Sequence, residues 1–350
     1  MRITSLLVAL AIAAVVPSTG FGSGGRAVAQ EEAGFQAWLV QFRRQAEREG
    51  VSRRTLDAVL PTLTFNPRVI ELDRAQPGGN PNAPAAAIPA FAPYRVKHVD
   101  SARIGRGRVK YSALRPKLSA IERQTGVPES IMVAIWGHET NYGAFSGDFD
   151  LARSLASLAY EGRRRDLFTG ELIATLKLMD MGFPRERLKG SWAGATGYPQ
   201  FLPSMYLRLA RDGDGDGRAD IWTSEADALA SIANYFVKAG WKPNVPWGVA
   251  VTVPASLSRT AIANRTVSPR CPRVQDRHSQ WKTIAEWRAL GVRPIGAPVP
   301  ADSEMASLLE PDGPGATAYL LTGNYRVILD YNCSNFYALS VGLLADAVRQ

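Results

Sequence analysis

The strongest constraint on the fold is a short run at residues 131–136 (Ile-Met-Val-Ala-Ile-Trp), which is apolar on every side. A helix that is hydrophobic all round belongs in the interior of a protein. Pro128 suits a first helical turn, and Gly143 indicates that the helix ends near residue 139. Glu139 follows Ile135 by four positions, so it continues the same stripe along the buried helix. The sequence therefore predicts an acidic side chain at the end of a core helix.

Glu139 is the most informative acid in the chain. Burial disfavours a charged carboxylate, and so does the negative end of a helix dipole, so both effects are expected to raise its pKa. A carboxyl group that stays protonated near neutral pH can act as a general acid. The alternative is a glutamate that ends its helix in a salt bridge. Position alone does not separate these two interpretations.

The rest of the chain is mostly helical in pattern, with one late change of texture. Apolar residues recur at helical spacing around 35–46, 111–121, 167–179, 229–236 and 336–348. Residues 249–253 alternate as a strand would, and residues 319–329 flank a Thr-Gly-Asn turn that predicts a hairpin. We therefore expect an α+β fold that is mainly α, with a small β subdomain inserted late.

The expected divisions follow from these patterns. A Pro- and Ala-rich segment at 77–93 is predicted to be a surface loop, because it has few charges and no apolar periodicity. In chain order we expect a signal peptide at 1–29, an N-terminal helical region at 30–110, a core at 111–240, a β subdomain at 241–330 and a C-terminal segment at 331–350.

The N-terminus has the layout of a secretory signal. A cationic start precedes an apolar run at 6–16, and Ala27-Val28-Ala29 matches a small-x-small cleavage site. The apolar run is shorter than the ~20 residues that a membrane-spanning helix needs. No cysteine follows it, which argues against a lipoprotein. We expect export to the periplasm with cleavage after Ala29, and an uncleaved anchor is the alternative.

Charge and cysteine content narrow the partners and ligands. The formal net charge of +9 suits a polyanionic partner, but export makes nucleic acid an unsuitable one. Cys271 and Cys333 are the two cysteines, and outside the reducing cytosol they predict one disulfide. Two unpaired buried thiols are the alternative. So few cysteines, with no His/Cys cluster, argue against a zinc site.

A second acidic pattern occurs at residues 212–217, where Asp212, Asp214 and Asp216 alternate with glycines. This spacing matches positions 1, 3, 5 and 6 of an EF-hand calcium loop. Three carboxylates this close would repel one another without a cation. The glutamate expected at position 12 is absent, because Thr223 stands there. The alternative is an acidic, Gly-rich surface turn without a metal.

Residues 191–206 (SWAGATGYPQFLPSMY) combine small residues, aromatic residues and the amide of Gln200. Such a segment lets the backbone approach a ligand closely while aromatic faces line a groove. A tight structural turn is the alternative, and on composition alone the two remain open.

Several motifs taken together resemble one family. Residues 136–143 (WGHETNYG) resemble the glutamate motif of the lytic murein transglycosylase B family, glycoside hydrolase family 103, and residues 191–206 resemble its second signature. Residues 162–172, 233–236 and 331–338 are similar to three further motifs of that family, in the same order. The resemblance extends from residue 35 to the end of the chain.

The resemblance implies a lysozyme-like catalytic core and a set of site residues. It makes Glu139 the catalytic acid and base. The residues that it places along the saccharide groove are Ser191, Gln200, Tyr235, Tyr331, Asn332 and Tyr337. Arg163 and Arg164 are weaker candidates for its rim, and solvated surface arginines are the alternative. Thr196 and Pro199 depart from a frequent Met and Gly in the second signature, which implies a reshaped subsite.

The implied reaction is cleavage of the MurNAc-β-1,4-GlcNAc bond of peptidoglycan with 1,6-anhydromuramoyl ends, using one carboxyl group and no metal. The implied partners are glycan strands and other cell-wall enzymes, with a monomeric protein. The resemblance also implies a longer structural calcium loop, closed by Asp227 and assisted by the carbonyl of Arg218. Two alternatives remain: a muramidase-type hydrolase on the same fold, and a non-catalytic peptidoglycan-binding protein.

Overall fold

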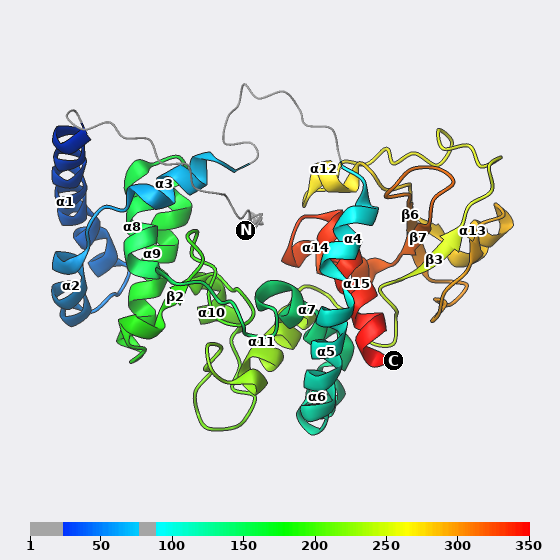
Figure 1. Ribbon diagram of the computed structural model, residues 1–350, viewed down its shortest axis with the longest axis horizontal. Coiled ribbons are helices and arrows are strands. Elements are labelled where there is room, and N and C mark those ends of the chain that lie inside the picture. Colours follow the sequence, from blue (N-terminus) through cyan, green and yellow to red (C-terminus); the bar gives the residue numbers. More distant parts are fainter. Residues whose placement is uncertain (1–23, 77–88) are drawn as a thin grey trace.

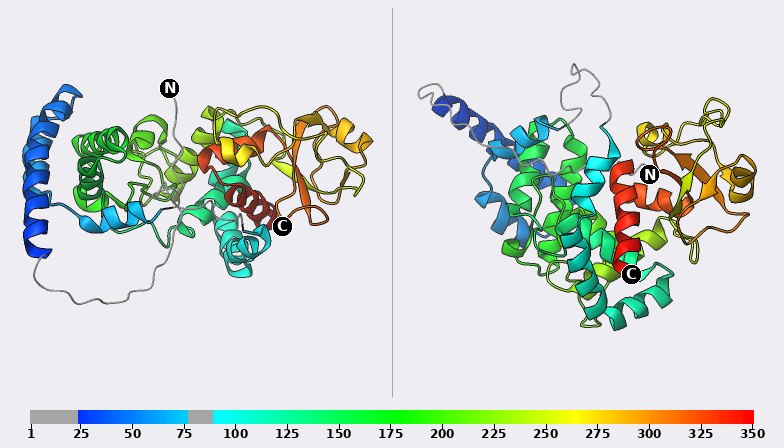
Figure 2. Two further views of the ribbon diagram at one scale, coloured as in Figure 1. Left: turned by 90° about the horizontal axis from the view of Figure 1, so that it is seen from above. Right: turned by 45° about the vertical axis from the view of Figure 1, so that its right-hand side comes forward.

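The computed structural model describes residues 24–76 and 89–350 of the chain. Figure 1 shows a molecule in which N-terminal helices lie at one end of the long axis and a small sheet lies at the other. The two views of Figure 2 show the same order, with α1 and the sheet farthest apart. The predicted mainly helical α+β architecture is confirmed.

One helical end of the molecule is built around a pair of antiparallel neighbours, α8 and α9, with the N-terminal helices packed on them. Its elements are α1 (Gly24–Arg48), α2 (Arg53–Val59), η1 (Leu60–Thr62), α3 (Pro67–Arg74), α8 (Leu151–Glu161), α9 (Arg165–Asp180) and η2 (Arg185–Arg187). Phe35 is fully buried and packs edge-on against Tyr160 of α8. Ser52 caps α2 by accepting the N–H of Thr55, as its side chain predicts for a helix start.

The centre of the molecule holds the core helix predicted from residues 131–136. Its elements are α5 (Ser101–Ala113), α6 (Arg115–Thr125), α7 (Glu129–Thr140), α10 (Pro203–Leu209), α11 (Glu225–Lys238) and α15 (Asn335–Arg349), with the short strands β1 (Phe149–Asp150) and β2 (Lys189–Gly190). Residues 131–136 are all buried. The pattern of the sequence therefore located the most enclosed helix of the fold.

The amphipathic pattern at 111–121 was expected to be one helix, and it is divided between two. α5 ends at Ala113 and α6 begins at Arg115, with Leu114 between them outside the helical region (φ −100°, ψ 6°). Pro116 occupies the first turn of α6. Because proline has no N–H to donate to the preceding turn and its ring crowds that turn, a continuous helix is disfavoured here and the chain breaks at Leu114.

The predicted surface loop at 77–93 is wrong at its C-terminal end. Its larger part, 77–88, lies outside the described residues, but α4 (Phe91–His98) includes the last three positions. Phe91 is buried and packs against Phe336 at a ring distance of 5.3 Å, and its N–H donates to Asp312. The end of this segment is therefore helical, although its composition is typical of a loop, because Phe91 is anchored in the core.

The β subdomain is an antiparallel sheet in the order β4-β6-β7-β3-β5. Its elements are β3 (Gly248–Thr252), β4 (Lys282–Thr283), β5 (Arg293–Pro294), β6 (Met305–Leu309) and β7 (Ala318–Leu321), with α12 (Pro272–Gln275) and α13 (Ile284–Ala289). The subdomain has its own apolar cluster, in which Trp287 is fully buried. Val249 is paired with Leu320, as part of the register between β3 and β7.

The hairpin predicted at 319–329 is wrong. After β7 the chain enters α14 (Gly323–Tyr331), and β7 pairs with β3 and β6 instead. Thr322 caps α14 by accepting the N–H of Asn324. The Asn324 amide also donates to the carbonyls of Lys242 and Val245. These long-range bonds fix a Thr-Gly-Asn sequence, typical of a turn, as the start of a helix.

A disulfide joins Cys271 and Cys333, as predicted, and connects the β subdomain to the segment before α15. Within residues 24–76 and 89–350, no helix has both the length and the apolar character needed to cross a membrane. The predicted signal peptide, 1–29, falls mostly outside the described residues.

Candidate active site

Glu139 is the penultimate residue of α7, and the local sequence ends the helix just beyond it. Asn141 adopts a left-handed conformation (φ 51°) and donates its N–H back to the Gly137 carbonyl at 3.1 Å. Gly143 also has a positive φ, and a Cβ there would meet the ring of Tyr198. The chain thus turns sharply away, which leaves the Glu139 side chain half-buried at the helix end.

The carboxyl group of Glu139 has one hydrogen-bond partner among the described residues, the phenol of Tyr337. Tyr337 Oη donates to Glu139 Oε1 at 2.6 Å. The phenol comes from α15, whose first turn is capped by Ser334. Burial raises the pKa of Glu139 to about 7, and the bond from Tyr337 acts in the opposite direction. Both the acid and the carboxylate are therefore accessible near neutral pH, as a proton-transferring group requires.

Aromatic side chains surround this carboxyl group. Tyr331 donates its hydroxyl to the Pro199 carbonyl at 2.6 Å, and its ring lies 4.7 Å from that of Tyr235. Burial, followed by the negative charge of Glu139, raises the pKa of Tyr331 and of Tyr337. The structure therefore brings Glu139 together with Tyr337 and Tyr331, and Tyr235 packs behind Tyr331.

Tyr94 belongs to the same surroundings, and sequence analysis missed it. It lies on α4, where burial and then the charge of Glu139 raise its pKa. Its ring stacks on His98 at 3.8 Å. No local signal marks Tyr94, because α4 follows the Pro- and Ala-rich segment and packs on α15 only in the folded chain.

His138, next to Glu139 in the chain, is held in its neutral form. Burial lowers its pKa to about 3, and the charge of Arg103 lowers it further. Its ring lies 5.6 Å from Tyr337 and 6.2 Å from His98. A cationic imidazole here would favour ionised Glu139, so a neutral one is consistent with the raised pKa of the acid.

Residues 191–202 form a set of tight turns bonded to the residues that follow α7, and α10 begins at Pro203. Gln200 has a positive φ (52°), and its amide donates to the carbonyls of Ser146 and Gly197 at 3.1 and 2.9 Å. Ser191 is nearly buried, and its hydroxyl accepts the Ala195 N–H at 3.0 Å. Both predicted groove residues therefore have structural bonds of their own.

Asn332 is the last of the predicted groove residues. Its amide oxygen is buried without a hydrogen-bond partner in the described structure. It directly follows Tyr331, whose ring contacts Tyr235. An orphaned acceptor costs free energy unless another group donates to it, so this oxygen suits a ligand hydroxyl or amide.

Arg163 and Arg164, the weaker rim candidates, are partly buried and both form ion pairs. Both guanidinium groups pair with the buried carboxylate of Asp73, Arg163 through a 2.7 Å hydrogen bond from Nε. Asp73 is 1% exposed. The arginines therefore connect α3 to the start of α9, which is a structural role.

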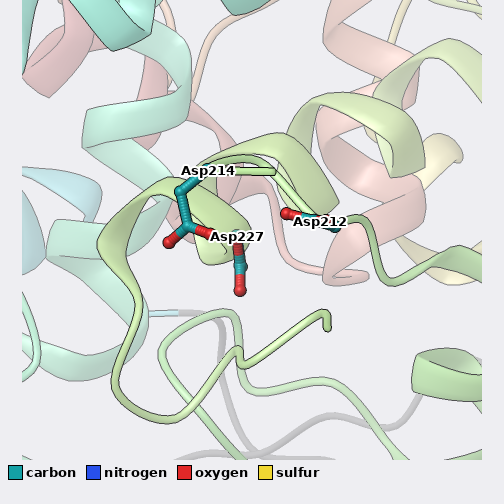
Figure 3. A group of neighbouring side chains, drawn as sticks. All are labelled: Asp212, Asp214 and Asp227. Carbon is teal, nitrogen blue, oxygen red and sulfur yellow. The ribbon is translucent and has the colours of Figure 1, made fainter. Parts of the chain in front are cut away.

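The acidic loop brings together three of the predicted calcium ligands, Asp212, Asp214 and Asp227. Oxygens of these residues all lie within 4.8 Å of one another, and Figure 3 shows the side chains converging. Asp227 is buried and reaches the loop from the first turn of α11. The carboxylate of Asp216 is not part of this group and accepts the N–H of Arg218 at 2.8 Å.

Comparisons with known proteins identify a family over most of the chain. The family described as "Transglycosylase SLT domain" matches residues 34–346. The membrane-bound lytic murein transglycosylase B of Escherichia coli K12 is 31% identical over 312 residues, which are 87% of this chain and 80% of that protein. Both comparisons cover most of the chain.

Solved structures show the same likeness. SltB3 of Pseudomonas aeruginosa, in complex with NAG-anhNAM-pentapeptide, superposes with a TM-score of 0.79 at 38% identity, covering 90% of this chain and 79% of that one. The Escherichia coli Slt35 structure with calcium has a TM-score of 0.71 at 29% identity, covering 90% and 92%. The expected lysozyme-like, mainly helical fold is thereby confirmed.

Proposed function

This chain belongs to the lytic transglycosylases that contain the transglycosylase SLT domain, and on that premise we propose that it cleaves the MurNAc-β-1,4-GlcNAc bond of peptidoglycan, leaving 1,6-anhydromuramoyl ends. The observation that carries the proposal is the environment of Glu139. One carboxyl group with a pKa of about 7 lies at the end of a buried helix and accepts a bond from a single phenol. Such a group can both give and take a proton at neutral pH.

In the first step, Glu139 protonates the glycosidic oxygen as the bond from the muramoyl C1 to that oxygen breaks. The GlcNAc of the next disaccharide leaves as an alcohol, and the muramoyl ring takes on oxocarbenium-like character. The substrate's own N-acetyl group assists, as in glycosidases that depart from the two-carboxylate arrangement. Tyr337 then donates to the carboxylate that Glu139 has become, which stabilises the charge.

In the second step, the Glu139 carboxylate removes the proton from the muramoyl 6-hydroxyl, and that oxygen bonds to C1. The proton balance closes, because Glu139 ends the cycle protonated. Water is not consumed. Since the nucleophile belongs to the same sugar, its effective concentration is high. The aromatic groove residues Tyr235 and Tyr331 are proposed to hold the glycan, with the Asn332 oxygen accepting from a sugar hydroxyl or amide; Ser191 and Gln200 are proposed to line the groove beside them.

A hydrolase that used two carboxylates would need a second free acid near Glu139. Asp150 is engaged elsewhere, because it caps α8 through the Arg153 N–H and pairs with Arg185 at 2.8 Å. Asp148 is exposed. Internal attack by the 6-hydroxyl requires no such acid, and this favours the transglycosylase over the muramidase-type alternative.

Calcium is proposed to bind the acidic loop as a structural ion. Asp212, Asp214 and Asp227 fit the oxygen ligands that calcium prefers, and their convergence leaves like charges in need of a cation. Asp216 and the carbonyl of Arg218 are proposed as further ligands. A bound ion would connect the loop to the start of α11 and would take no part in bond cleavage. That Slt35 was crystallised with calcium supports this assignment.

The site of action is proposed to be the periplasm, reached through the signal at 1–29, with the protein acting as a monomer on glycan strands and alongside other cell-wall enzymes. SltB3 was solved with NAG-NAM-pentapeptide, which supports a peptide-bearing glycan as substrate.

Mass spectrometry of the products tests the proposal. Purified sacculi incubated with the protein should release muropeptides that are lighter by one water than their reducing-end counterparts. Hydrated reducing ends would identify a hydrolase, and intact sacculi that retain the protein would identify a binding protein without activity.

A further inference from the structure

A cavity of about 560 Å³ lies beside the end of the catalytic helix, on the side of α5. One wall is formed by α5 through Arg106, Val109 and Lys110. The other is formed by the turn 141–144, which begins two residues after Glu139. None of the groups assigned above to bond cleavage lines this cavity, so the reaction itself leaves it without a role.

The wall formed by α5 carries two cationic side chains, Arg106 and Lys110. Within its bounds α5 carries Arg103, Arg106, Arg108 and Lys110, and it has no acidic residue. Lys110 is neutralised, because it pairs with Glu225 at 2.5 Å. Arg106 is not: its Nε and Nη2 donate to the amide oxygen of Asn141 at 3.1 and 2.8 Å, and that oxygen is neutral. An exposed guanidinium with no counter-charge among the described residues therefore faces the cavity.

The bond from Arg106 to Asn141 fixes the guanidinium in position. Asn141 is held in the left-handed conformation that ends α7, so it is a rigid acceptor. A fork-shaped guanidinium held in this way can present its remaining N–H groups to a planar carboxylate. Val109, which is 68% exposed, supplies an apolar surface beside it. A carboxylate next to a short aliphatic chain matches both features.

The short stretch of chain between Glu139 and the cavity wall suits such a ligand. Two residues of chain span at most about 7 Å, so the Cα of Asn141 lies within that distance of the Cα of Glu139. A peptide of five residues extended from a sugar at Glu139 reaches roughly 17 Å. A stem attached to the muramoyl group can therefore enter the cavity while its sugar stays at the site of cleavage.

We propose that this cavity binds a carboxylate of the peptide stem on the muramoyl residue, with Arg106 as the residue that recognises it. The inference rests on the proposed function, because it assigns a subsite for that substrate. A cavity of this volume that is open to solvent admits one extended chain. Arg106 is thus a specificity-determining residue, and it has no part in proton transfer.

The test compares two substrates made from one preparation: stem-bearing sacculi, and glycan strands whose stems have been removed by an amidase. Arg106→Gln keeps a donor for Asn141 and removes the charge. Arg108→Gln, on the same helix, is the matched control, because Arg108 donates to the Ala347 carbonyl and lies outside the cavity. One charge-assisted hydrogen bond is worth about tenfold in affinity.

Arg106→Gln should raise KM on stem-bearing sacculi about tenfold and leave turnover of the stripped glycan within twofold, while Arg108→Gln changes neither. Equal loss on both substrates, or no loss on either, overturns the inference. Co-sedimentation with stem-bearing and stripped glycan, in the Glu139→Gln background, gives the same comparison without turnover. A wild type that cleaves neither substrate would reject the proposed function, and co-sedimentation would still decide the role of Arg106.

Discussion

The molecule has two sites built from carboxyl groups, and their surroundings are opposite. Glu139 lies at the C-terminal end of a buried helix with one neutral donor, and burial raises its pKa to about 7. Asp212 lies in an exposed loop, where the N–H groups of Gly217 and Gly215 lower the pKa of its carboxyl group. The first environment keeps a proton available, and the second keeps a permanent negative charge available.

The comparison shows that burial and hydrogen-bond donors move the pKa of a carboxyl group in opposite directions. In buried Asp227 burial outweighs the bonds from Gly213 and Asp220, and its pKa is raised. Donors stabilise the carboxylate, and burial without donors stabilises the neutral acid. A bound cation can neutralise the carboxylates of the loop, whereas Glu139 is neutralised by protonation. The predictions below test this contrast.

The largest effect is expected from Glu139→Gln. Glutamine keeps the shape and can still accept from Tyr337, but it cannot exchange a proton. We expect turnover of sacculi to fall by a factor of about 10²–10⁴ or more, because one group serves both steps. Glu310→Gln is the matched control, since Glu310 pairs with Arg259 in the β subdomain. Activity of Glu139→Gln near that of the control would reject Glu139 as the catalyst.

Removing calcium should affect stability but not the pH dependence of the reaction. At calcium 100-fold above Kd, mass action stabilises the fold by about 2.7 kcal/mol. The melting temperature of the wild type should therefore be higher in calcium than in chelator, and Asp227→Asn should shrink that difference. Asp148→Asn, an exposed acid outside the cluster, should retain it. Identical melting curves of the wild type in both conditions would rule the ion out.

Tyr337→Phe should alter the pH profile with a smaller loss of rate. The bond from Tyr337 lowers the pKa of Glu139, so its removal allows that pKa to rise. Activity that depends on the acid form falls as pH rises through about 7 in the wild type, and this fall should move to higher pH in the variant. Loss of one hydrogen bond to a charged group costs about tenfold in turnover. Tyr331→Phe, which loses only its bond to Pro199, should keep the wild-type midpoint.

The last effect concerns stability. The pKa of Glu139 is raised in the folded state, so its favourable contribution is complete below pH 4.5 and is lost as pH rises through about 7. Glu139→Gln removes this dependence. Chemical denaturation at pH 4 and pH 8 should show the variant gaining stability relative to the wild type at the higher pH. A difference that is constant across this range would contradict a buried, neutral Glu139.

The sequence predicted the parts of the site that depend on local pattern. Residues 131–136 are apolar all round, so they located the buried helix and placed Glu139 at its end. Ser224 has a side chain typical of a helix start, and it accepts the N–H of Asp227 at the start of α11. The alternating aspartates at 212–216 predicted an acidic loop, and two of them converge with Asp227. In each case the information lies within one or two turns of the chain.

The sequence did not predict features that depend on distant partners. Thr322-Gly323-Asn324 reads as a hairpin turn, and only bonds from Asn324 to residues about 80 positions earlier make it a helix start. The sequence around Arg163 is typical of a groove or surface residue. Its partner Asp73 lies 90 positions earlier in the chain, so the local pattern does not reveal the ion pair. Tyr94 carries no signal because the carboxyl group that it faces belongs to another helix.

The hydrogen bond between Tyr337 and Glu139 joins residues 198 positions apart in the chain. A chain that emerges from its amino end exposes the acid long before the helix that completes its surroundings. Contacts between residues so far apart in the chain slow folding, because the long loop between them must be closed. On the proposed function, Glu139 without Tyr337 lacks the donor that stabilises its charged form, so we expect the site to be complete only once α15 has docked.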